Sequence, residues 1–244
     1  MERLTAIGRR TAEIAKQELV LLAITVLMAG SLWAFIWISE EVSEGDTHGI
    51  DEAILLSLRT PGDHSDPLGP GWVEELGRDV TALGGVGVLT FITLASVVFL
   101  ILSGKHRAAM FVAAAIASGV LVSVALKSGF DRPRPGLVPH GSIVNSASFP
   151  SGHSMMSALV YLTLGALLAR LQPKRRLKAY VILLSLLVTV AVGISRVYLG
   201  VHWPTDVLAG WAAGAAWAML CWILVLWLQR HHQVEPTTGQ LEDP

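Results

Sequence analysis

The chain has 244 residues, of which 52% are hydrophobic and 15% are charged. Soluble domains usually contain about 25% charged residues, so this composition excludes an ordinary soluble domain and indicates a membrane protein. The net charge of -1 predicts no particular partner, because positive and negative residues are segregated along the chain. Cys221 is the only cysteine, which excludes an internal disulfide and a cysteine-rich metal site.

Six apolar runs approach the roughly 20 residues that a helix needs to cross a bilayer. We therefore predict an all-α fold, a six-span transmembrane helical bundle with an amphipathic helix or loop on its outer face. The fourth and fifth runs are short, so five spans remain an alternative if one of them is re-entrant. The predicted spans cover residues 19–39, 81–103, 108–127, 154–171, 180–195 and 207–227.

The chain is predicted to form one transmembrane domain over residues 1–232, followed by a polar, disordered tail over residues 233–244. The first apolar run follows a basic segment, as in a signal peptide. It is too long for a typical signal-peptide core, and no clear small-x-small cleavage site follows it. We therefore expect it to be retained as a helix.

The positions of Lys and Arg predict the orientation, because cytoplasmic loops are enriched in both. The N-terminal segment, the links after spans two and four, and the segment after span six are all basic. Six spans place these four segments on one side, which we expect to be the cytoplasm together with both termini. The loops at 40–80, 128–153 and 196–206 then face outwards. We expect a bacterial cytoplasmic membrane with these loops on its periplasmic or extracellular side.

The first outer loop contains two different patterns. Residues 50–59 have the apolar and polar spacing of a short amphipathic helix that lies on the membrane surface. Residues 61–72 are rich in Gly, Pro and Asp, which is typical of a loop. This region is either a surface cap or a lid for a lipid substrate.

Four cationic residues lie on the outer side, in or directly beside the loops at 128–153 and 196–206 and against the positive-inside tendency: Lys127, Arg132, Arg134 and Arg196. A function explains this placement better than topology does. Arg presents a fork of N–H donors that matches the oxygens of a phosphate. Arg132 has two open interpretations, since it either binds a second phosphate or head group or caps its own loop.

The segment Ser151-Gly152-His153 comes directly before the fourth span. Free backbone N–H groups at the start of a helix bind anions, and a glycine lets an anion approach closely. Ser151 either caps that helix or donates its hydroxyl. Together with Lys127, Arg134 and Arg196, this segment predicts a cradle for a tetrahedral oxyanion.

His202 and Asp206 are four residues apart, so a turn or helix would bring them together. A carboxylate beside an imidazole fixes its tautomer and leaves the other ring nitrogen free to attack. His153 is the second candidate, and its natural role is a general acid towards the leaving oxygen. The residues alone do not decide which histidine attacks.

A metal site built from His153, His202 and Asp206 is a rival interpretation, because such a triad is compatible with a divalent ion. The surrounding cations argue against it, since they would repel a metal ion. Asp131 is the only other acid in the two outer stretches that contain these residues.

At these residues the sequence resembles the type 2 phosphatidic acid phosphatase (PAP2) family, which shares its site pattern with the vanadium haloperoxidases. The first part of the family pattern, a Lys, six residues and Arg-Pro, matches residues 127–135. The second part, Pro-Ser-Gly-His, matches residues 150–153. The third part, Ser-Arg, five residues, His, three residues and Asp, matches residues 195–206. The six-span layout extends the resemblance over most of the chain.

The resemblance implies a role for each matched position. His202 would form a phosphohistidine, Asp206 would orient it, and His153 would protonate the leaving group. No metal and no cofactor are implied. The residues implied to bind the phosphate are Lys127, Arg134, Ser151, Gly152 and Arg196.

We therefore predict a metal-independent enzyme that hydrolyses a lipid phosphate monoester or pyrophosphate at the outer face of the membrane. Its expected partners are the lipid phosphate and the bilayer, with no nucleic acid, and its oligomeric state is left open. Undecaprenyl pyrophosphate, phosphatidylglycerol phosphate, phosphatidic acid and a lipid A phosphate all fit, because the motifs read phosphate and not the lipid. A lipid phosphotransferase is the alternative with the same residues. A binding or transport protein would not need His202 and Asp206 beside His153.

Overall fold

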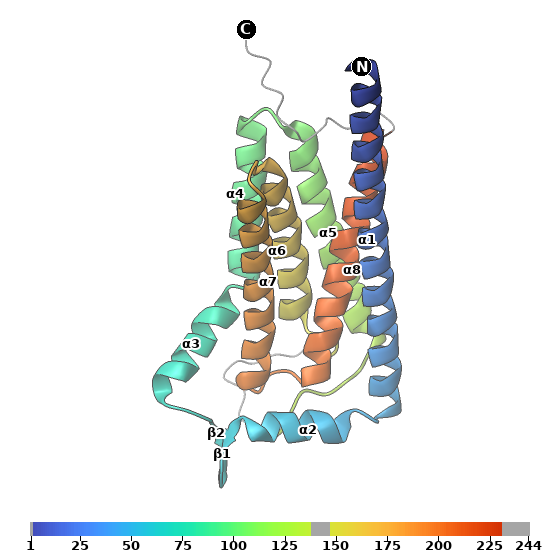
Figure 1. Cartoon of the computed structure of the whole chain (residues 1–244). Helices are drawn as coiled ribbons and strands as arrows, with labels where there is room; N and C mark the ends of the chain where they lie inside the picture. The colour runs from blue at the N-terminus through green and yellow to red at the C-terminus, as the bar shows by residue number, and fades with distance from the viewer. Residues whose placement is uncertain (1, 138–146, 231–244) are drawn as a thin grey trace.

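Six long helices stand side by side and form the body of the protein, with a shorter helix lying across one end (Figure 1). The computed structural model describes residues 2–137 and 147–230, so the predicted tail at 233–244 lies outside the described residues. The predicted all-α bundle is confirmed. The helices are α1 (Glu2–Glu44), α2 (His48–Ser57), α3 (Gly71–Ala82), α4 (Val86–Leu102), α5 (His106–Gly129), α6 (Gly152–Leu171), α7 (Arg175–Tyr198) and α8 (Pro204–Arg230).

Five of these helices are long and apolar enough to cross a bilayer on their own, and the bent pair of α3 and α4 makes a sixth candidate. The two short apolar runs of the sequence belong to α6 and α7, which are 20 and 24 residues long. Both are long enough to span, because a helix rises about 1.5 Å per residue. Less apolar residues at the ends of both helices add the length that the short apolar runs lacked. Neither helix is therefore too short to span the bilayer.

The second candidate span differs from the predicted run at 81–103. It consists of α4, which begins at Val86, and α3 meets it at an angle of 45°. Residues 83–85 form the break, and α3 leans away from the bundle (Figure 1). The sequence did not predict α3, because its charged residues interrupt the apolar pattern.

The stretch predicted as a loop over 61–72 is more ordered than its composition indicates. β1 (Arg59–Thr60) pairs antiparallel with β2 (Asp63–Pro67) in a short hairpin. Gly62 lies in the turn with a φ of 89°, a conformation that costs a glycine little.

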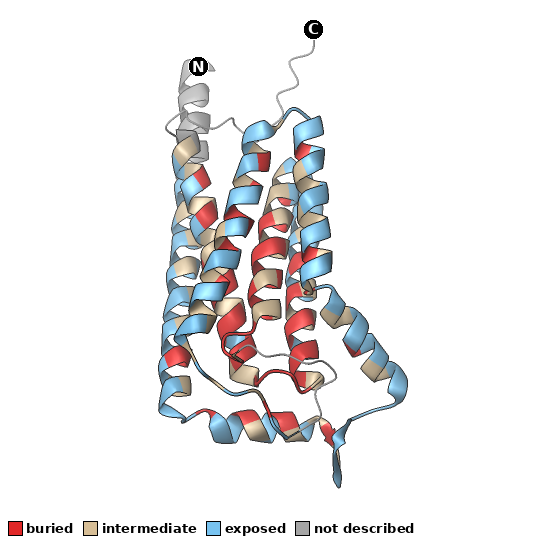
Figure 2. Ribbon diagram, turned by 180° about the vertical axis from the view of Figure 1, so that it is seen from behind, coloured by how far each residue is buried: buried red, intermediate tan, exposed pale blue. Residues whose placement is uncertain are grey.

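The amphipathic segment predicted at 50–59 is helix α2, which lies across the end of the bundle where α7 meets α8 (Figure 1). Its buried residues Asp51 and Leu55 are one turn apart and so share one face of the helix. Figure 2 shows buried segments of α2 between exposed ones. Leu55 packs with Val197, Trp203 and Val207. α2 is therefore a cover over this end of the bundle.

α6 lies at the centre and packs against both α7 and α8. The last helix contains small residues that allow close helix packing, as at Gly210 and Gly214. A Cβ atom on Gly210 would lie 2.7 Å from the carbonyl oxygen of Ser151, and one on Gly214 would lie 2.2 Å from that of Met155. This close approach places the first turn of α8 directly beside the first turn of α6.

Candidate functional site

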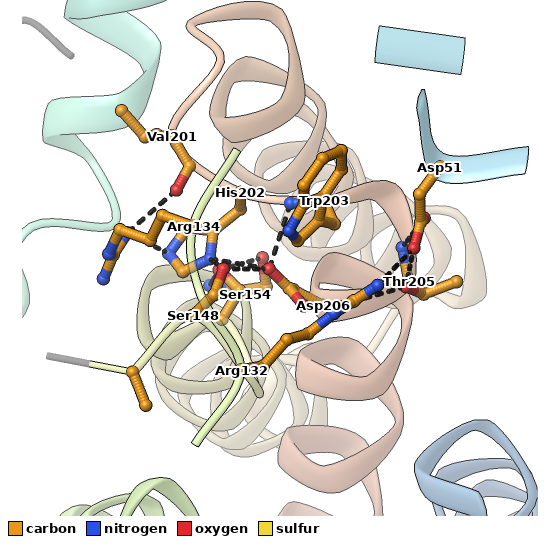
Figure 3. Close-up of polar contacts among 12 residues, drawn as sticks. Asp51, Arg132, Arg134, Ser148, Ser154, Val201, His202, Trp203, Thr205 and Asp206 are labelled. Atoms are coloured by element: carbon orange, nitrogen blue, oxygen red, sulfur yellow. Dashed lines mark hydrogen bonds and ion pairs between the residues drawn. The ribbon is translucent and has the colours of Figure 1, made fainter. Parts of the chain in front are cut away.

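The predicted site residues come together at the end of the bundle that α2 covers, where α5, α6, α7 and α8 end or begin. Figure 3 shows three of them, Arg134, His202 and Asp206, next to one another. Each lies near a helix end, so its backbone is fixed by the bundle while its side chain reaches the shared space. Electrostatic contacts connect them across four elements. The residues gathered there are Lys127, Arg134, Ser151, Gly152, His153, Arg196, His202 and Asp206.

Ser151 is the N-cap of α6, as its position before the fourth span allows. Its side chain accepts a hydrogen bond from the backbone N–H of Ser154, over 3.4 Å, and another from the Ser154 hydroxyl at 3.0 Å. The backbone N–H of Ser151 donates to the carbonyl oxygen of Asp206 at 3.0 Å, which ties the start of α6 to α8. A Cβ on Gly152 would lie 3.3 Å from Cε of Lys127, so this glycine leaves room for the lysine to pass.

His202 is 2% exposed and lies between two partners of opposite charge. Its Nδ1 is 3.2 Å from Oδ2 of Asp206, and its Nε2 is 3.2 Å from a guanidinium nitrogen of Arg134. Arg134 can only donate, so Nε2 must be the acceptor and the ring proton must lie on Nδ1. This tautomer leaves a lone pair on Nε2, which is the state that a nucleophilic histidine requires.

The charge state of His202 follows from its burial. Burial lowers the pKa of His202 to about 4, although the hydrogen bond and the charge of Asp206 act in the opposite direction. The imidazole is therefore neutral at physiological pH. A neutral ring with its proton on Nδ1 is ready to attack through Nε2 without first losing a proton.

The carboxylate of Asp206 is fully buried, and both of its oxygens accept hydrogen bonds. Oδ2 accepts from the backbone N–H of Trp203 at 3.0 Å and from the hydroxyl of Ser148, in addition to His202. Oδ1 accepts from Nη1 of Arg132 at 2.6 Å. A buried carboxylate is expensive unless such donors surround it, so the set keeps Asp206 ionised and fixed in orientation.

Arg132 is held by carboxylates on both sides. Its second guanidinium nitrogen donates to Oδ2 of Asp51 at 2.7 Å, and the side chain is 12% exposed. Arg132 also lies over the ring of Trp203, whose indole N–H donates to the carbonyl oxygen of Pro133. Of its two interpretations, this geometry favours a structural role in its own loop over binding of a second phosphate.

Arg196 and Lys127, in contrast, have neutral partners among the described residues. Nη1 of Arg196 donates to the hydroxyl of Thr81 at 3.0 Å, while its buried Nε has no hydrogen-bond partner in the described part of the chain. Nζ of Lys127 donates to the carbonyl oxygen of Ala147 at 2.9 Å. A buried N–H without a partner is unusual in proteins and indicates a place for a ligand acceptor.

His153 lies in the first turn of α6, beside the break between α3 and α4. A Cβ on Gly84 would lie 3.5 Å from the His153 side chain, so the break lines the site. Arg196, His202, Arg134 and Lys127 all act electrostatically on the His153 ring. No hydrogen bond joins this ring to another described residue, which leaves it available for proton transfer at the centre of the cluster.

The charges of the site favour an anion. Four cationic side chains face two buried carboxylates, and both carboxylates are engaged with Arg132. Lys127 and Arg196 form no ion pair with a carboxylate among the described residues, and a helix N-terminus adds partial positive charge beside them. Such a surplus matches a phosphate group that carries two negative charges. A neutral histidine within this surplus has the chemistry of a nucleophile.

Sequence reasoning missed four residues that shape this site: Asp51, Thr81, Ser148 and Thr205. Asp51 is on a helix that the sequence placed at the membrane surface, where an acidic residue is expected in water. Thr81 lies at the end of a helix that the sequence did not predict. In contrast to these four residues, Arg132 was indicated by the sequence, because it lies two residues before Arg134 in the same proline-rich run.

Comparison with known proteins places this site in a family. The family model of the PAP2 superfamily matches residues 108–230, a range that holds all eight predicted site residues. Phosphatidylglycerophosphatase B of Bacillus subtilis is 34% identical over 146 residues, which are 59% of this chain and 70% of that protein. Undecaprenyl-diphosphatase of Sulfolobus acidocaldarius is 43% identical over 68 residues, which are 28% of this chain and 29% of that protein.

A solved structure agrees with the sequence matches. The crystal structure of a transmembrane PAP2 type phosphatidylglycerolphosphate phosphatase from Bacillus subtilis superimposes with a TM-score of 0.69 at 27% identity. The superposition covers 85% of this chain and 98% of that one. The similarity therefore includes the helical bundle as well as the motifs.

Thr81→Val should weaken binding of an inorganic anion at the site. The variant keeps the shape of the side chain but removes the acceptor that orients Arg196. We expect orthophosphate to bind roughly fivefold to tenfold more weakly, since a hydrogen bond is worth about 1 kcal/mol. The measurement is the rise in melting temperature of the purified protein with phosphate concentration.

Thr93→Val is the matched control, because the buried hydroxyl of Thr93 has no partner in the described chain. It should give the same phosphate-dependent rise as the wild type. An unchanged rise in Thr81→Val would show that Thr81 does not orient an anion-binding group.

Proposed function

The chain belongs to the PAP2 superfamily, and from this membership we propose that it is a membrane phosphatase that removes phosphate from a lipid without a metal ion. The observation that carries the proposal is the neutral His202, held by Asp206 and facing a cationic cradle with Nε2. The names of the two relatives, a phosphatidylglycerophosphatase and an undecaprenyl-diphosphatase, support a lipid phosphate as the substrate class.

We propose a reaction in two displacements. In the first, Nε2 of His202 attacks phosphorus, the bond to the leaving oxygen breaks, and His153 gives that oxygen a proton. In the second, a water molecule attacks the phosphohistidine, His153 takes the proton of the water, and the P–N bond breaks to release phosphate. Asp206 keeps the proton on Nδ1 and stabilises the positive charge that the ring acquires after attack.

The cradle has a separate task in this mechanism. Lys127, Arg134 and Arg196 would donate to the non-bridging oxygens, together with the hydroxyl of Ser151 and the backbone N–H of Gly152. Arg134 now shares its donors between Nε2 of His202 and the carbonyl oxygen of Val201 at 2.8 Å. A bound phosphate would draw Arg134 towards its own oxygens and expose the lone pair of Nε2 to phosphorus.

The orientation in the membrane is also a proposal. The basic links between α4 and α5 and between α6 and α7 lie at the end opposite α2, as do the start of α1 and the end of α8 (Figure 1). Cytoplasmic loops are enriched in Lys and Arg, so this end would face the cytoplasm of a bacterium. The site would then open at the outer face of the cytoplasmic membrane, where lipid head groups are within its reach.

A substrate panel tests the proposed function. Purified protein in detergent and chelator should release phosphate from at least one of phosphatidylglycerol phosphate, phosphatidic acid, undecaprenyl pyrophosphate and lipid A. His202→Ala is the matched control and should release none. Absence of release from every lipid would overturn the hydrolase, while transfer of the phosphate to another lipid would identify a phosphotransferase. Loss of activity on chelation would indicate a metal enzyme.

His153→Ala should discriminate between leaving groups. A general acid contributes about 10²–10⁴-fold when the leaving oxygen needs a proton. We therefore expect a large loss on an alkyl phosphate lipid and a much smaller loss on p-nitrophenyl phosphate, whose leaving group needs no proton. The measurement is kcat/KM of wild type and variant on both substrates. An equal loss on both would exclude His153 as the acid.

The pH profile of kcat/KM should report His202. A protonated ring cannot attack, so activity should fall on the acid side as the pH decreases towards the pKa of His202, which is about 4. Asp206 raises this pKa, so Asp206→Asn should lower the rate and move the acid limb to still lower pH. The phosphate of the substrate also ionises near pH 6, and this ionisation affects the pH profiles of wild type and Asp206→Asn equally. An acid limb at higher pH in Asp206→Asn than in wild type would contradict the assignment of this limb to His202.

A further inference from the structure

A continuous chain of ionic contacts leads from the covering helix α2 to His202 (Figure 3). Asp51 of α2 accepts from Arg132 at 2.7 Å, and Arg132 donates to Asp206 at 2.6 Å. Asp206 in turn accepts from Nδ1 of His202 at 3.2 Å. Asp51 and Asp206 are both fully buried, so this chain is shielded from water and keeps most of its electrostatic strength.

Arg132 determines which oxygen of Asp206 faces His202. It occupies Oδ1, and this leaves Oδ2 for His202, the hydroxyl of Ser148 and the backbone of Trp203. Without Arg132, the buried Oδ1 of Asp206 would lose its only charged hydrogen-bond donor among the described residues. The carboxylate would then be free to rotate out of the orientation in which Oδ2 faces Nδ1, although its negative charge would act on the ring more strongly.

Asp51 has two effects on the same group. Its Oδ1 accepts from the backbone N–H of Thr205 at 2.9 Å, and its Oδ2 accepts from the Thr205 hydroxyl at 2.6 Å. Asp51 therefore caps the first turn of α8, the turn that holds Asp206, although it comes from a different helix. Its negative charge also balances Arg132, so that Arg132 is shared and does not fully neutralise Asp206.

We propose that Asp51 and Arg132 are positioning residues of this site, which hold the Asp206 carboxylate in the orientation and charge state that His202 needs. Neither is among the residues predicted from the sequence motifs. The proposal rests on the proposed phosphatase function. It makes α2 a functional part of the site in addition to a cover over the end of the bundle.

The proposal predicts opposite electrostatic effects for the two residues. Asp51 and Arg132 have opposite charges and act on His202 through the same carboxylate. Loss of the positive charge should strengthen the attraction of Asp206 for a proton on His202, and loss of the negative charge should weaken it. The charged and titratable groups that face His202 and Asp206 from all packed elements are Asp51 of α2, Lys127 of α5, Arg132 and Arg134 of the following segment, His153 of α6 and Arg196 of α7.

The experiment measures kcat, KM and the acid limb of kcat/KM for the full-length protein in detergent, with the panel lipid that wild type hydrolyses fastest. Arg132→Gln should move the acid limb to higher pH, and Asp51→Asn should move it to lower pH. Both should reduce kcat by about tenfold or more with little change in KM, by analogy with groups that orient metal-bound histidines. The double variant should have its limb between those of wild type and Arg132→Gln.

Arg132→Lys separates charge from geometry and guards against a variant that fails to fold. Lysine keeps the positive charge but is not forked, so it reaches one carboxylate well and the other poorly. Its acid limb should stay near that of wild type, while kcat should fall. The melting temperature of each variant reports folding independently of activity.

Arg59→Gln is the matched structural control. Arg59 is a buried arginine at the same end of the bundle, and it donates to the carbonyl oxygen of Tyr198 at 2.9 Å, without a bond to Asp206. This variant should lower stability and leave the acid limb unchanged. If Arg132→Gln and Asp51→Asn behave like Arg59→Gln, or shift the limb in the same direction, Asp51 and Arg132 are structural only and the proposal is wrong. An inactive wild type would instead overturn the proposed function together with this proposal.

Discussion

The buried carboxylate of Asp206 is the constraint on which the rest of the site depends. An ionised group away from water is tolerated only when donors surround it, and the chain supplies them from separate segments. Ser148 and Arg132 come from the connection between α5 and α6, and His202 and Trp203 come from the link before α8. Folding of these segments around one carboxylate assembles the site, so its stability and its proposed chemistry share the same contacts.

The helices can converge on that carboxylate because the chain has glycine where α8 crosses α6. Gly210 and Gly214 let the two backbones approach to distances at which no side chain fits. The backbone bond from Ser151 to Asp206 then fixes the start of α6 relative to α8. Small residues are a general means of packing helices in a membrane, where the lipid provides no hydrophobic driving force. Here the same device sets the distance between the helix that would bind phosphate and the residue that would attack it.

The sequence predicted the bundle and the residues of the candidate site for physical reasons that a single chain displays. Apolar runs indicate the length of a span. Within residues 195–206, His202 and Asp206 are one turn apart, so their spacing along the chain already predicts that their side chains meet. Asp51 and Thr81 gave no such signal, because each contacts the site across more than 100 residues of chain. Their burial depends on how α2 and α3 dock, and an acidic residue or a threonine in a polar loop looks the same whether it is docked or in water.

The segment that carries Asp51 and Thr81 also lies outside residues 108–230, the range that the family model matches. Within that range lie the groups that would read phosphate, and a phosphate monoester offers them the same oxygens on any lipid. The two named relatives act on different lipid phosphates, so discrimination between lipids requires contacts beyond these groups. α2 and α3 touch the site through Arg132 and Arg196, respectively, while the rest of both helices remains at the bundle surface. The segment that contains α2 and α3 is therefore placed to connect the surroundings of a lipid head group with the residues that would hold its phosphate.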